Sequence, residues 1–353
     1  MWQLENRTPF AAERSWVRDR DGTEVWLVAV KASFDILDDA RLRVAKEQAP
    51  VLRLPEHHGE AGHSSVKYDA DLVLTKVNTD IVVVGHACAP AGTQVNLLDC
   101  GFRVGAVQKL VRVFGDRTWA SNGATTAQAF EKMPVVYERA FGGTDPHSSD
   151  AATHWDLRNP VGTGFVGDKP PPAGLRLPNI EDPKALIAQW KDKPSPAGLG
   201  VVATHWQPRA AMAGTYGAEW QETRAPLLAH DLDDRWFQST PPDQQAAGFL
   251  QGGEPVILHN LGPHGPGGRL QFYLPKVDLR FETHFYDGSQ VPHASCNLHT
   301  VILEPDLPRV SVVWHTALPC HAKVHKLDRT VITLLAGGRQ AEAENQKREL
   351  AQP

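Results

Sequence analysis

The residues of this chain whose types and spacing best suit chemistry are histidines and cysteines toward its end. His293, Cys296 and His299 stand three residues apart, and four more follow at His315, Cys320, His321 and His325. Neutral imidazole and thiolate are ligands that zinc prefers in tetrahedral sites. Cys296 and His299, however, lead into an expected strand, where side chains three residues apart point to opposite faces. We therefore expect scattered strand histidines, with a zinc site as the alternative.

A second group of histidines, His57, His58 and His63, lies in a polar stretch between two expected strands. Imidazoles so close in sequence can converge on zinc, but no fourth ligand stands at a recognisable spacing. Contact with solvent explains Glu56 and Glu60 as well as metal binding does. We expect an exposed, mobile loop here and no metal.

Three acids, Asp231, Asp233 and Asp234, are candidates for acid–base chemistry or a divalent cation. Their spacing does not match an EF-hand loop, because neither the glycine nor the closing glutamate falls in register. A helix start explains them more simply. Asp231 would cap the helix, and the other two would stabilise its first turn through the helix dipole.

A formal G-x-G-x-x-G occurs at Gly162, Gly164 and Gly167. A dinucleotide site needs a strand before this motif and a helix after it. Here Asn159-Pro160 precedes the motif and three prolines follow it at 170–172, so no helix can begin there. We expect no nucleotide cofactor, and no other cofactor is indicated.

Aromatic and basic residues recur together in the middle of the chain. Trp206, Trp220 and Trp236 each have an arginine close in sequence, and arginine stacked on an aromatic ring is frequent in binding surfaces. Packing within an irregular segment is the simpler explanation, and a shallow partner groove is the alternative. The candidate partner-binding residues are Tyr137, Arg139, Phe141, Trp206, Arg209, Trp220, Arg235 and Trp236.

The elements that must position these residues are mostly strands. Alternating, β-branched stretches closed by turn residues predict strands at 25–36, 41–54, 66–75, 81–88, 95–100, 104–114, 254–260, 270–274, 279–286, 297–303, 310–316 and 323–335. Short helices are expected at 124–133 and 184–191. The fold class is therefore mainly β (β-rich α+β), with antiparallel sheets forming a sandwich or a distorted barrel in two lobes.

The chain divides into four parts by composition. Residues 1–118 are expected to form an N-terminal β lobe, and 119–253 an irregular segment with short helices and long loops. Residues 254–336 are expected to form a C-terminal β lobe, and 337–353 a polar tail that is a frayed helix or disordered. The first three parts should make one compact unit.

Composition excludes several classes of function. The 353 residues carry a formal net charge of -5 with no basic run, so no nucleic acid partner is expected. No apolar run approaches the roughly 20 residues that span a bilayer, and the N-terminus does not resemble a signal peptide. Four cysteines lie scattered at positions 88, 100, 296 and 320. Together these features predict a cytoplasmic protein with reduced thiols and no membrane partner.

Five ordered segments carry a family resemblance: YERAFGG (137–143), NPVGTGF (159–165), LPNIEDP (177–183), GTYGAEW (214–220) and DLDDRWFQSTPPDQQ (231–245). With EPVILHNL (254–261) and Leu274-Pro275, they resemble a formerly uncharacterised bacterial family encoded beside the VgrG and PAAR spike genes of type VI secretion systems. The resemblance covers roughly residues 29–334. It is strongest in the middle segment.

This resemblance implies a non-enzymatic cytoplasmic adaptor or chaperone. Such a protein binds an effector toxin or a PAAR-containing spike protein and helps to load it onto VgrG, which it meets indirectly. The resemblance implies no cofactor and supplies no catalytic residues.

A hydrolase that uses loop carboxylates and tryptophans, acting on carbohydrate or on another substrate, is the alternative function. Ten tryptophans and many loop acids favour it, because sugars stack on indole and glycosidases use paired carboxylates. Nothing in the sequence pairs two acids convincingly, and Asp233 and Glu254 are the residues to test. The exposed sheet edges of a β-rich fold favour the adaptor, since a partner can add a strand to them.

Overall fold

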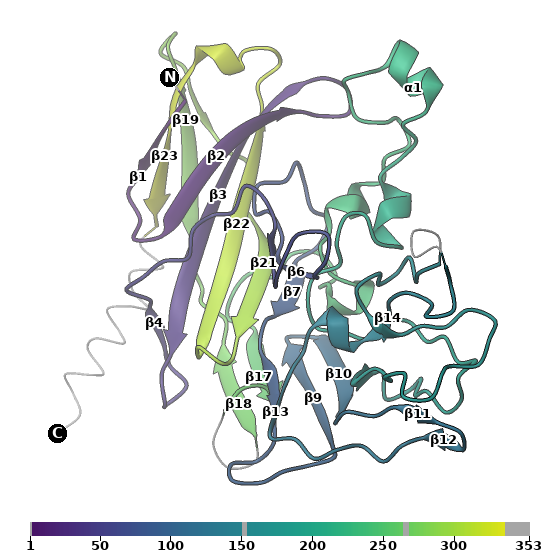
Figure 1. The fold of residues 1–353 in the computed structure, drawn as a ribbon. Helices are drawn as coiled ribbons and strands as arrows, with labels where there is room; N and C mark the ends of the chain where they lie inside the picture. Colours follow the sequence, from purple (N-terminus) through teal and green to yellow (C-terminus); the bar gives the residue numbers. More distant parts are fainter. Residues whose placement is uncertain (1, 150–153, 264–267, 336–353) are drawn as a thin grey trace, which may run out of the picture.

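The computed structural model describes residues 2–149, 154–263 and 268–335, and in these ranges the chain is mainly β, as predicted. Three open sheets and four two-stranded ribbons carry most of the structure, and helices are few and short (Figure 1). Because each of the three larger sheets has two free edges, the architecture matches the sandwich rather than the barrel.

The largest sheet has six strands and runs in the order β2–β3–β22–β21–β7, with β4 also pairing β3. The strands are β2 (Ala11–Arg18), β3 (Glu24–Ile36), β4 (Leu42–Val44), β7 (Asp80–Val83), β21 (Asn297–Glu304) and β22 (Arg309–Pro319). All neighbours are antiparallel except β21 and β7, which are parallel. Strand β3 is buried along nearly its whole length, as its continuous apolar sequence requires.

A five-stranded sheet follows the order β16–β10–β9–β17–β18. Its strands are β9 (Leu97–Val104), β10 (Val107–Phe114), β16 (Ile180–Glu181), β17 (Pro255–His259) and β18 (Arg269–Tyr273). Strands β9 and β10 form a hairpin that turns at Gly105 and Ala106, so the predicted break at 101–103 is wrong. The pairing keeps Phe102 and Val104 facing the core, and that burial extends the strand past Cys100.

The third sheet has the order β1–β23–β19–β20. Its strands are β1 (Gln3–Asn6), β19 (Leu279–Phe285), β20 (Gln290–Pro292) and β23 (Leu327–Leu334). Strands β1 and β2 were not predicted from sequence. In every larger sheet a strand from residues 1–118 pairs with one from 254–336: β3 with β22, β9 with β17, and β1 with β23.

Four ribbons complete the β structure. They pair β5 (Glu56–His57) with β6 (Val66–Tyr68), β8 (His86–Cys88) with β13 (Lys132–Pro134), β11 (Trp119–Ala120) with β12 (Gly123–Ala124), and β14 (Phe141–Gly142) with β15 (Thr163–Gly164). The predicted strands at 41–54 and 66–75 shrink to β4 and β6. One reason is that Asp71 Oδ2 accepts the Leu52 amide at 2.7 Å, which fixes both stretches through a side chain instead of a ladder.

The two predicted helices at 124–133 and 184–191 are wrong. In the first, Phe130 exchanges backbone hydrogen bonds with Val95, and this tertiary pairing overrides local helix propensity. In the second, the carboxylates of Asp182, Glu181 and Asp192 accept backbone amides that a helix would use. The observed helices are α1 (Ala218–Thr223) and the 3₁₀ turns η1 (Tyr137–Arg139), η2 (Arg209–Met212), η3 (Asp234–Phe237), η4 (Pro242–Gln244) and η5 (Val324–Lys326).

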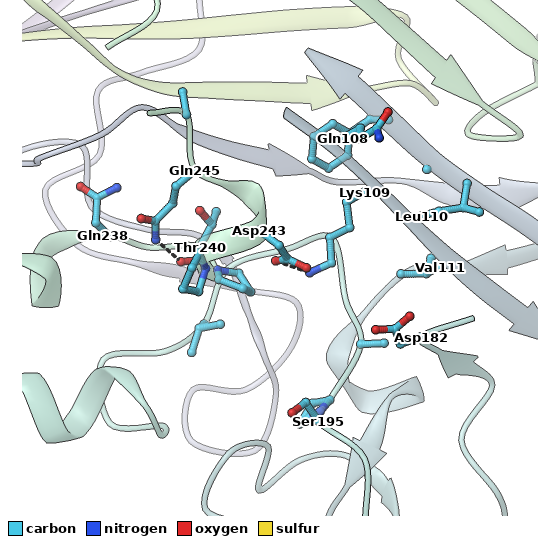
Figure 2. A pocket seen from close by; sticks show the side chains of 18 of the residues that line it. Gln108, Lys109, Leu110, Val111, Asp182, Ser195, Gln238, Thr240, Asp243 and Gln245 are labelled. Carbon is cyan, nitrogen blue, oxygen red and sulfur yellow. Dashed lines mark hydrogen bonds and ion pairs between the residues drawn. The ribbon is translucent and has the colours of Figure 1, made fainter. Parts of the chain in front are cut away.

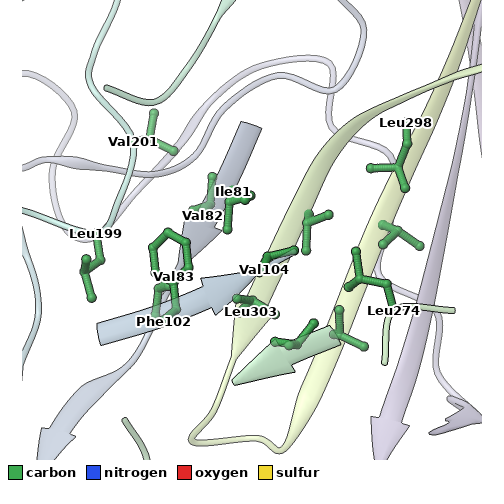
Figure 3. Packing of buried hydrophobic residues seen from close by; sticks show 14 of the residues in the cluster. Ile81, Val82, Val83, Phe102, Val104, Leu199, Val201, Leu274, Leu298 and Leu303 are labelled. Atoms are coloured by element: carbon green, nitrogen blue, oxygen red, sulfur yellow. The ribbon is translucent and has the colours of Figure 1, made fainter. Parts of the chain in front are cut away.

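One hydrophobic core joins the sheets to the middle segment. Ile81 and Val83 of β7, Phe102 of β9 and Leu303 of β21 pack together with Leu199 from the irregular part (Figure 3). Burying such side chains stabilises by about 1.5–3 kcal/mol each. The middle segment is therefore fixed on the sheets, and it covers the side of the molecule on which β9 and β10 lie (Figure 1).

Two further sequence expectations concern the chain as a whole. The polar tail predicted at 337–353 lies outside the described residues. Among the residues that are described, no helix is long and apolar enough to cross a membrane.

Candidate functional site

An open groove of about 1400 Å³ lies between the five-stranded sheet and the middle segment. One wall is the first half of β10 with the neighbouring part of β9. The opposite wall is the stretch Gln238–Ala247, which begins within the fifth signature segment, and loops at 182–184 and 195–197 close the end (Figure 2). We call this the signature groove.

Asp80 holds the wall formed by the fifth segment. Its carboxylate is fully buried and accepts hydrogen bonds from the Gln238 side chain at 3.0 Å, the Ser239 amide at 2.8 Å and the Thr240 hydroxyl at 2.6 Å. Lys76 Nζ lies 2.6 Å from the same carboxylate. A buried charge is stable only when it is paired and hydrogen-bonded, and here both conditions are met. The network therefore fixes where the wall runs.

The next residues of this segment are tied to both large sheets. The buried Gln244 side chain donates to the carbonyls of Ile81 and Leu199 at 3.0 and 2.9 Å. Lys109 Nζ of β10 bridges Asp243 at 2.8 Å and Gln244 Oε1 at 2.9 Å (Figure 2). Burial lowers the pKa of Lys109, while Asp243 opposes that shift. The turn η4 is thus pinned across the two sheets at the bottom of the groove.

The first two signature segments form one unit around Asn159. The Asn159 amide group donates to the carbonyls of Tyr137 and Phe141 at 2.7 and 3.0 Å. The backbone carbonyl of Asn159 accepts the Gly143 amide at 2.8 Å. Gly142 has φ 146°, and a Cβ there would lie 2.2 Å from the Asn159 carbonyl oxygen, so only glycine allows this approach. Two glycines of the formal nucleotide motif belong to the same packing, since a Cβ at Gly162 would lie 2.4 Å from Asn159 Nδ2 and Gly164 is the strand partner of Gly142.

The third segment joins the same unit to the groove wall. Asn179 accepts from Arg139 at 2.9 Å and donates to the Phe114 carbonyl at 3.1 Å. Arg117 pairs with the buried Glu181, which forms the short strand β16 beside β10. These bonds fix the position of β16, and the length of β16 determines how much of the edge of β10 is paired.

The aromatic candidates divide between scaffold and groove. Tyr137 and Trp206 are buried and pack edge to face, with ring centroids 5.7 Å apart. Phe141 packs on Phe165 away from the groove, and Trp220 lies on α1, where its indole donates to the Leu227 carbonyl. Of the eight candidates, the three that line the groove are Tyr137, Arg209 and Arg235.

The expected pairing of each tryptophan with its neighbouring arginine takes a different form. Arg209 is buried, lies 5.9 Å from the Trp236 ring and donates to the Trp236 carbonyl. It also bridges Asp69 at 2.8 Å. Arg235 turns instead to Asp233, and Arg224 donates to backbone carbonyls and His230. The contact between Arg209 and Trp236 thus joins η2 to η3, and it does not involve neighbours in the sequence.

The acids at 231–234 start a 3₁₀ turn, and the cap is Asp233 rather than the predicted Asp231. Asp233 accepts the Arg235 amide at 2.9 Å, and its bonds to Arg235 lower its pKa. Asp231 instead accepts the amide and hydroxyl of Thr215, which lowers its pKa and ties the fourth segment to the fifth. Asp233 and Glu254 are the two acids to test for the hydrolase alternative. Asp233 is ion-paired with Arg235, and Glu254 accepts the Gln251 amide.

Of the C-terminal histidines, His299 lies in β21 and His315 in β22, whereas His293 follows β20, His321 lies in a turn and His325 lies in η5. His299 and His315 stack with ring centroids 4.4 Å apart, and burial lowers the pKa of His315 to about 3. His293 bonds to the Thr283 and Thr316 hydroxyls, and burial raises the pKa of Cys296 to about 12. No group of three or more potential ligands gathers anywhere in the described ranges. Of the earlier histidines, His58 and His63 are exposed and His57 is half-buried, and desolvation lowers the pKa of His58.

Basic side chains dominate the lining of the groove. Two acids line it, Asp182 and Asp243. The seven arginines and lysines in the lining are Arg103, Lys109, Arg158, Lys184, Arg209, Arg235 and Arg269. Four have a carboxylate partner. Arg103, Lys184 and Arg269 are exposed and form no ion pair within the described part of the chain. The groove is therefore positive in a chain whose net charge is -5.

Sequence reasoning missed Asp80, Lys76 and Asn159. Asp80 directly precedes an apolar strand, and a carboxylate there is ordinarily read as a turn residue. Its partners lie about 160 positions away, so no local pattern reveals the network.

A profile of one protein family matches residues 21–315, which is most of the chain. The chain belongs to DUF2169, a family described as "uncharacterized protein conserved in bacteria". No curated protein and no solved structure matches it. All five signature segments lie inside the matched range.

Proposed function

We propose that this DUF2169 protein is a non-enzymatic adaptor that holds a segment of a partner polypeptide in the signature groove. The observation that carries the proposal is the groove itself, whose walls are fixed by buried hydrogen bonds while its lining stays open. Rigid walls lower the entropy lost on binding, because little of the protein has to be ordered.

The chemistry of the lining suits a peptide better than a small polar substrate. Apolar surface from Val202, Met212, Pro241 and Ile257 alternates with exposed cations. Tyr137 also lines the groove, but its hydroxyl is buried and has no hydrogen-bond partner within the described structure, so this residue contributes to the wall.

The biological setting that we propose is type VI secretion. The support is the order of the five signature segments, which resembles the family encoded beside VgrG and PAAR genes. In this setting the protein acts in the cytoplasm, binds an effector toxin or a PAAR-containing spike protein, and reaches VgrG through that partner.

The test is co-expression of the tagged protein with the products of adjacent genes, followed by affinity purification and mass spectrometry. We expect a PAAR-containing protein or effector to co-purify. The double variant Lys184→Glu with Arg235→Glu reverses two exposed groove charges and should reduce recovery at least tenfold.

The matched control is Arg43→Glu with Arg53→Glu, which reverses two exposed charges outside the groove. It should leave recovery unchanged. If no neighbouring product co-purifies, the type VI assignment is wrong. If both double variants bind like the wild type, the partner binds elsewhere.

A further inference from the structure

The edge of β10 that faces the groove is only partly paired. Strand β16 covers it at Arg112 and Val113, and the chain then leaves the sheet at Asp182-Pro183. Proline cannot continue the ladder as a donor, so the covering strand stops there. Residues 107–111 of β10 therefore have a neighbour on the β9 side alone.

The register shows which backbone groups are left open. In a two-residue hairpin the backbone groups of alternate residues bond to the partner strand, so those of Val107, Lys109, Val111 and Val113 bond to β9. The backbone groups of the other residues point away from β9, as the Phe114 amide shows by donating to the Asn179 carbonyl at 2.7 Å. Gln108 and Leu110 belong to this second set, so their amides and carbonyls point to the open edge. Both residues are exposed and line the groove.

Two of the exposed groove cations lie near this edge. Arg103 of β9 is the cross-strand partner of Gln108, so its side chain lies on the same face as that of Gln108. Lys184 follows the turn that ends β16, whereas Arg269 lies on β18 at the far edge of the same sheet. These are the three groove cations without an ion pair in the described ranges.

We propose that the occupant of the groove is an extended, acidic segment of the partner polypeptide, which adds to β10 as a further strand at Gln108–Leu110. Main-chain hydrogen bonds to these residues supply affinity, and Arg103 and Lys184 select acidic side chains. This proposal rests on the proposed function, and it adds the conformation and charge of the bound segment.

Edge addition can be blocked without unfolding the sheet. Proline at 110 removes the amide that faces the groove, and its ring occupies the space of an added strand, while the bonds between β10 and β9 stay intact. Leu110→Ala is the matched control, because it shortens the same side chain and keeps the amide. Gln108→Pro repeats the test if Leu110→Pro does not fold by circular dichroism.

The probe is a fluorescein-labelled ten-residue peptide of alternating valine and glutamate, with its valine–lysine counterpart, followed by anisotropy. We expect the glutamate peptide to bind and the lysine peptide to bind at least tenfold more weakly. Leu110→Pro should weaken binding of the glutamate peptide about tenfold or more, and Leu110→Ala less than threefold. Arg103→Glu with Lys184→Glu should also weaken it, and so should added salt.

Hydrogen exchange of the wild type supplies an independent readout, because bound peptide should slow the amides of Gln108 and Leu110. Strand addition is wrong if the glutamate peptide does not bind at millimolar concentration, or if the proline and alanine variants bind it equally. Acidic selection is wrong if the two peptides bind equally. If Leu110→Pro still recovers the cellular partner while Lys184→Glu with Arg235→Glu does not, the adaptor function stands and the strand mechanism falls.

Discussion

The two walls of the signature groove are built in opposite ways. On one side, Asp80 accepts hydrogen bonds from three consecutive residues and every polar group is satisfied in a fully buried site. On the other, Gln108 and Leu110 of β10 present backbone groups to open space. The difference separates the residues that shape the groove from those available to a ligand. It also predicts that the first wall matters to stability and the second to binding.

The largest effect on stability is expected at Asp80. Asp80→Ala leaves Lys76 buried without its carboxylate, which should lower the free energy of unfolding by about 3–5 kcal/mol in urea denaturation. Asp234→Ala is the control, because it breaks the exposed ion pair to Arg20 and should cost no more than about 1 kcal/mol. Equal losses in the two variants would mean that the Asp80 network does not hold the wall.

Asn159 should come next. Asn159→Ala removes the donor to two backbone carbonyls and should cost about 1–3 kcal/mol by the same assay. Replacing Asn179, whose hydrogen bonds are only partly buried, should cost less. A neutral Asn159→Ala would show that the first two signature segments do not depend on this side chain.

Acid should destabilise the sheet core through His315. Its folded pKa of about 3 lies below the roughly 6.5 of an unfolded histidine, so below pH 6.5 the unfolded chain binds more protons. Stability is therefore complete above pH 6.5 and falls as the pH drops toward 3. The loss at pH 5 should be about 2 kcal/mol from this residue. His315→Phe keeps a stacked ring and should reduce the loss of unfolding free energy between pH 6.5 and 5 by that amount. An unchanged loss would show that His315 does not cause the acid destabilisation.

The smallest effect on stability is expected at the open wall. Leu110→Pro should change the free energy of unfolding by less than about 1 kcal/mol, because the amide that it removes has no partner in the sheet. Thermal and urea unfolding measure this directly. A loss as large as that of Asp80→Ala would mean that the edge is structural, and the contrast between the walls would disappear.

The sequence predicted the large sheets better than the loops around the groove, for a physical reason. Strands such as β3, β21 and β22 are buried along continuous apolar runs, so local pattern and tertiary burial agree. The segment at 184–191 has helical composition, yet carboxylates of Glu181, Asp182 and Asp192 capture its amides. Local propensity does not contain that competition.

The candidate residues divide in the same way. Tyr137, Arg209 and Arg235 were predicted from their types and do line the groove. Trp206, equally prominent in sequence, is buried as scaffold. The β10 edge was not identified, because its exposure depends on where β16 ends, and β16 reaches β10 across about 70 residues of chain.

Hydrogen exchange of the purified complex with its co-purified partner tests the groove most directly. Relative to the free protein, the account predicts slower exchange at 108 and 110 and along 243–247, with no change in α1. Protection confined to α1 or to the outer strands β1 and β2 would contradict it.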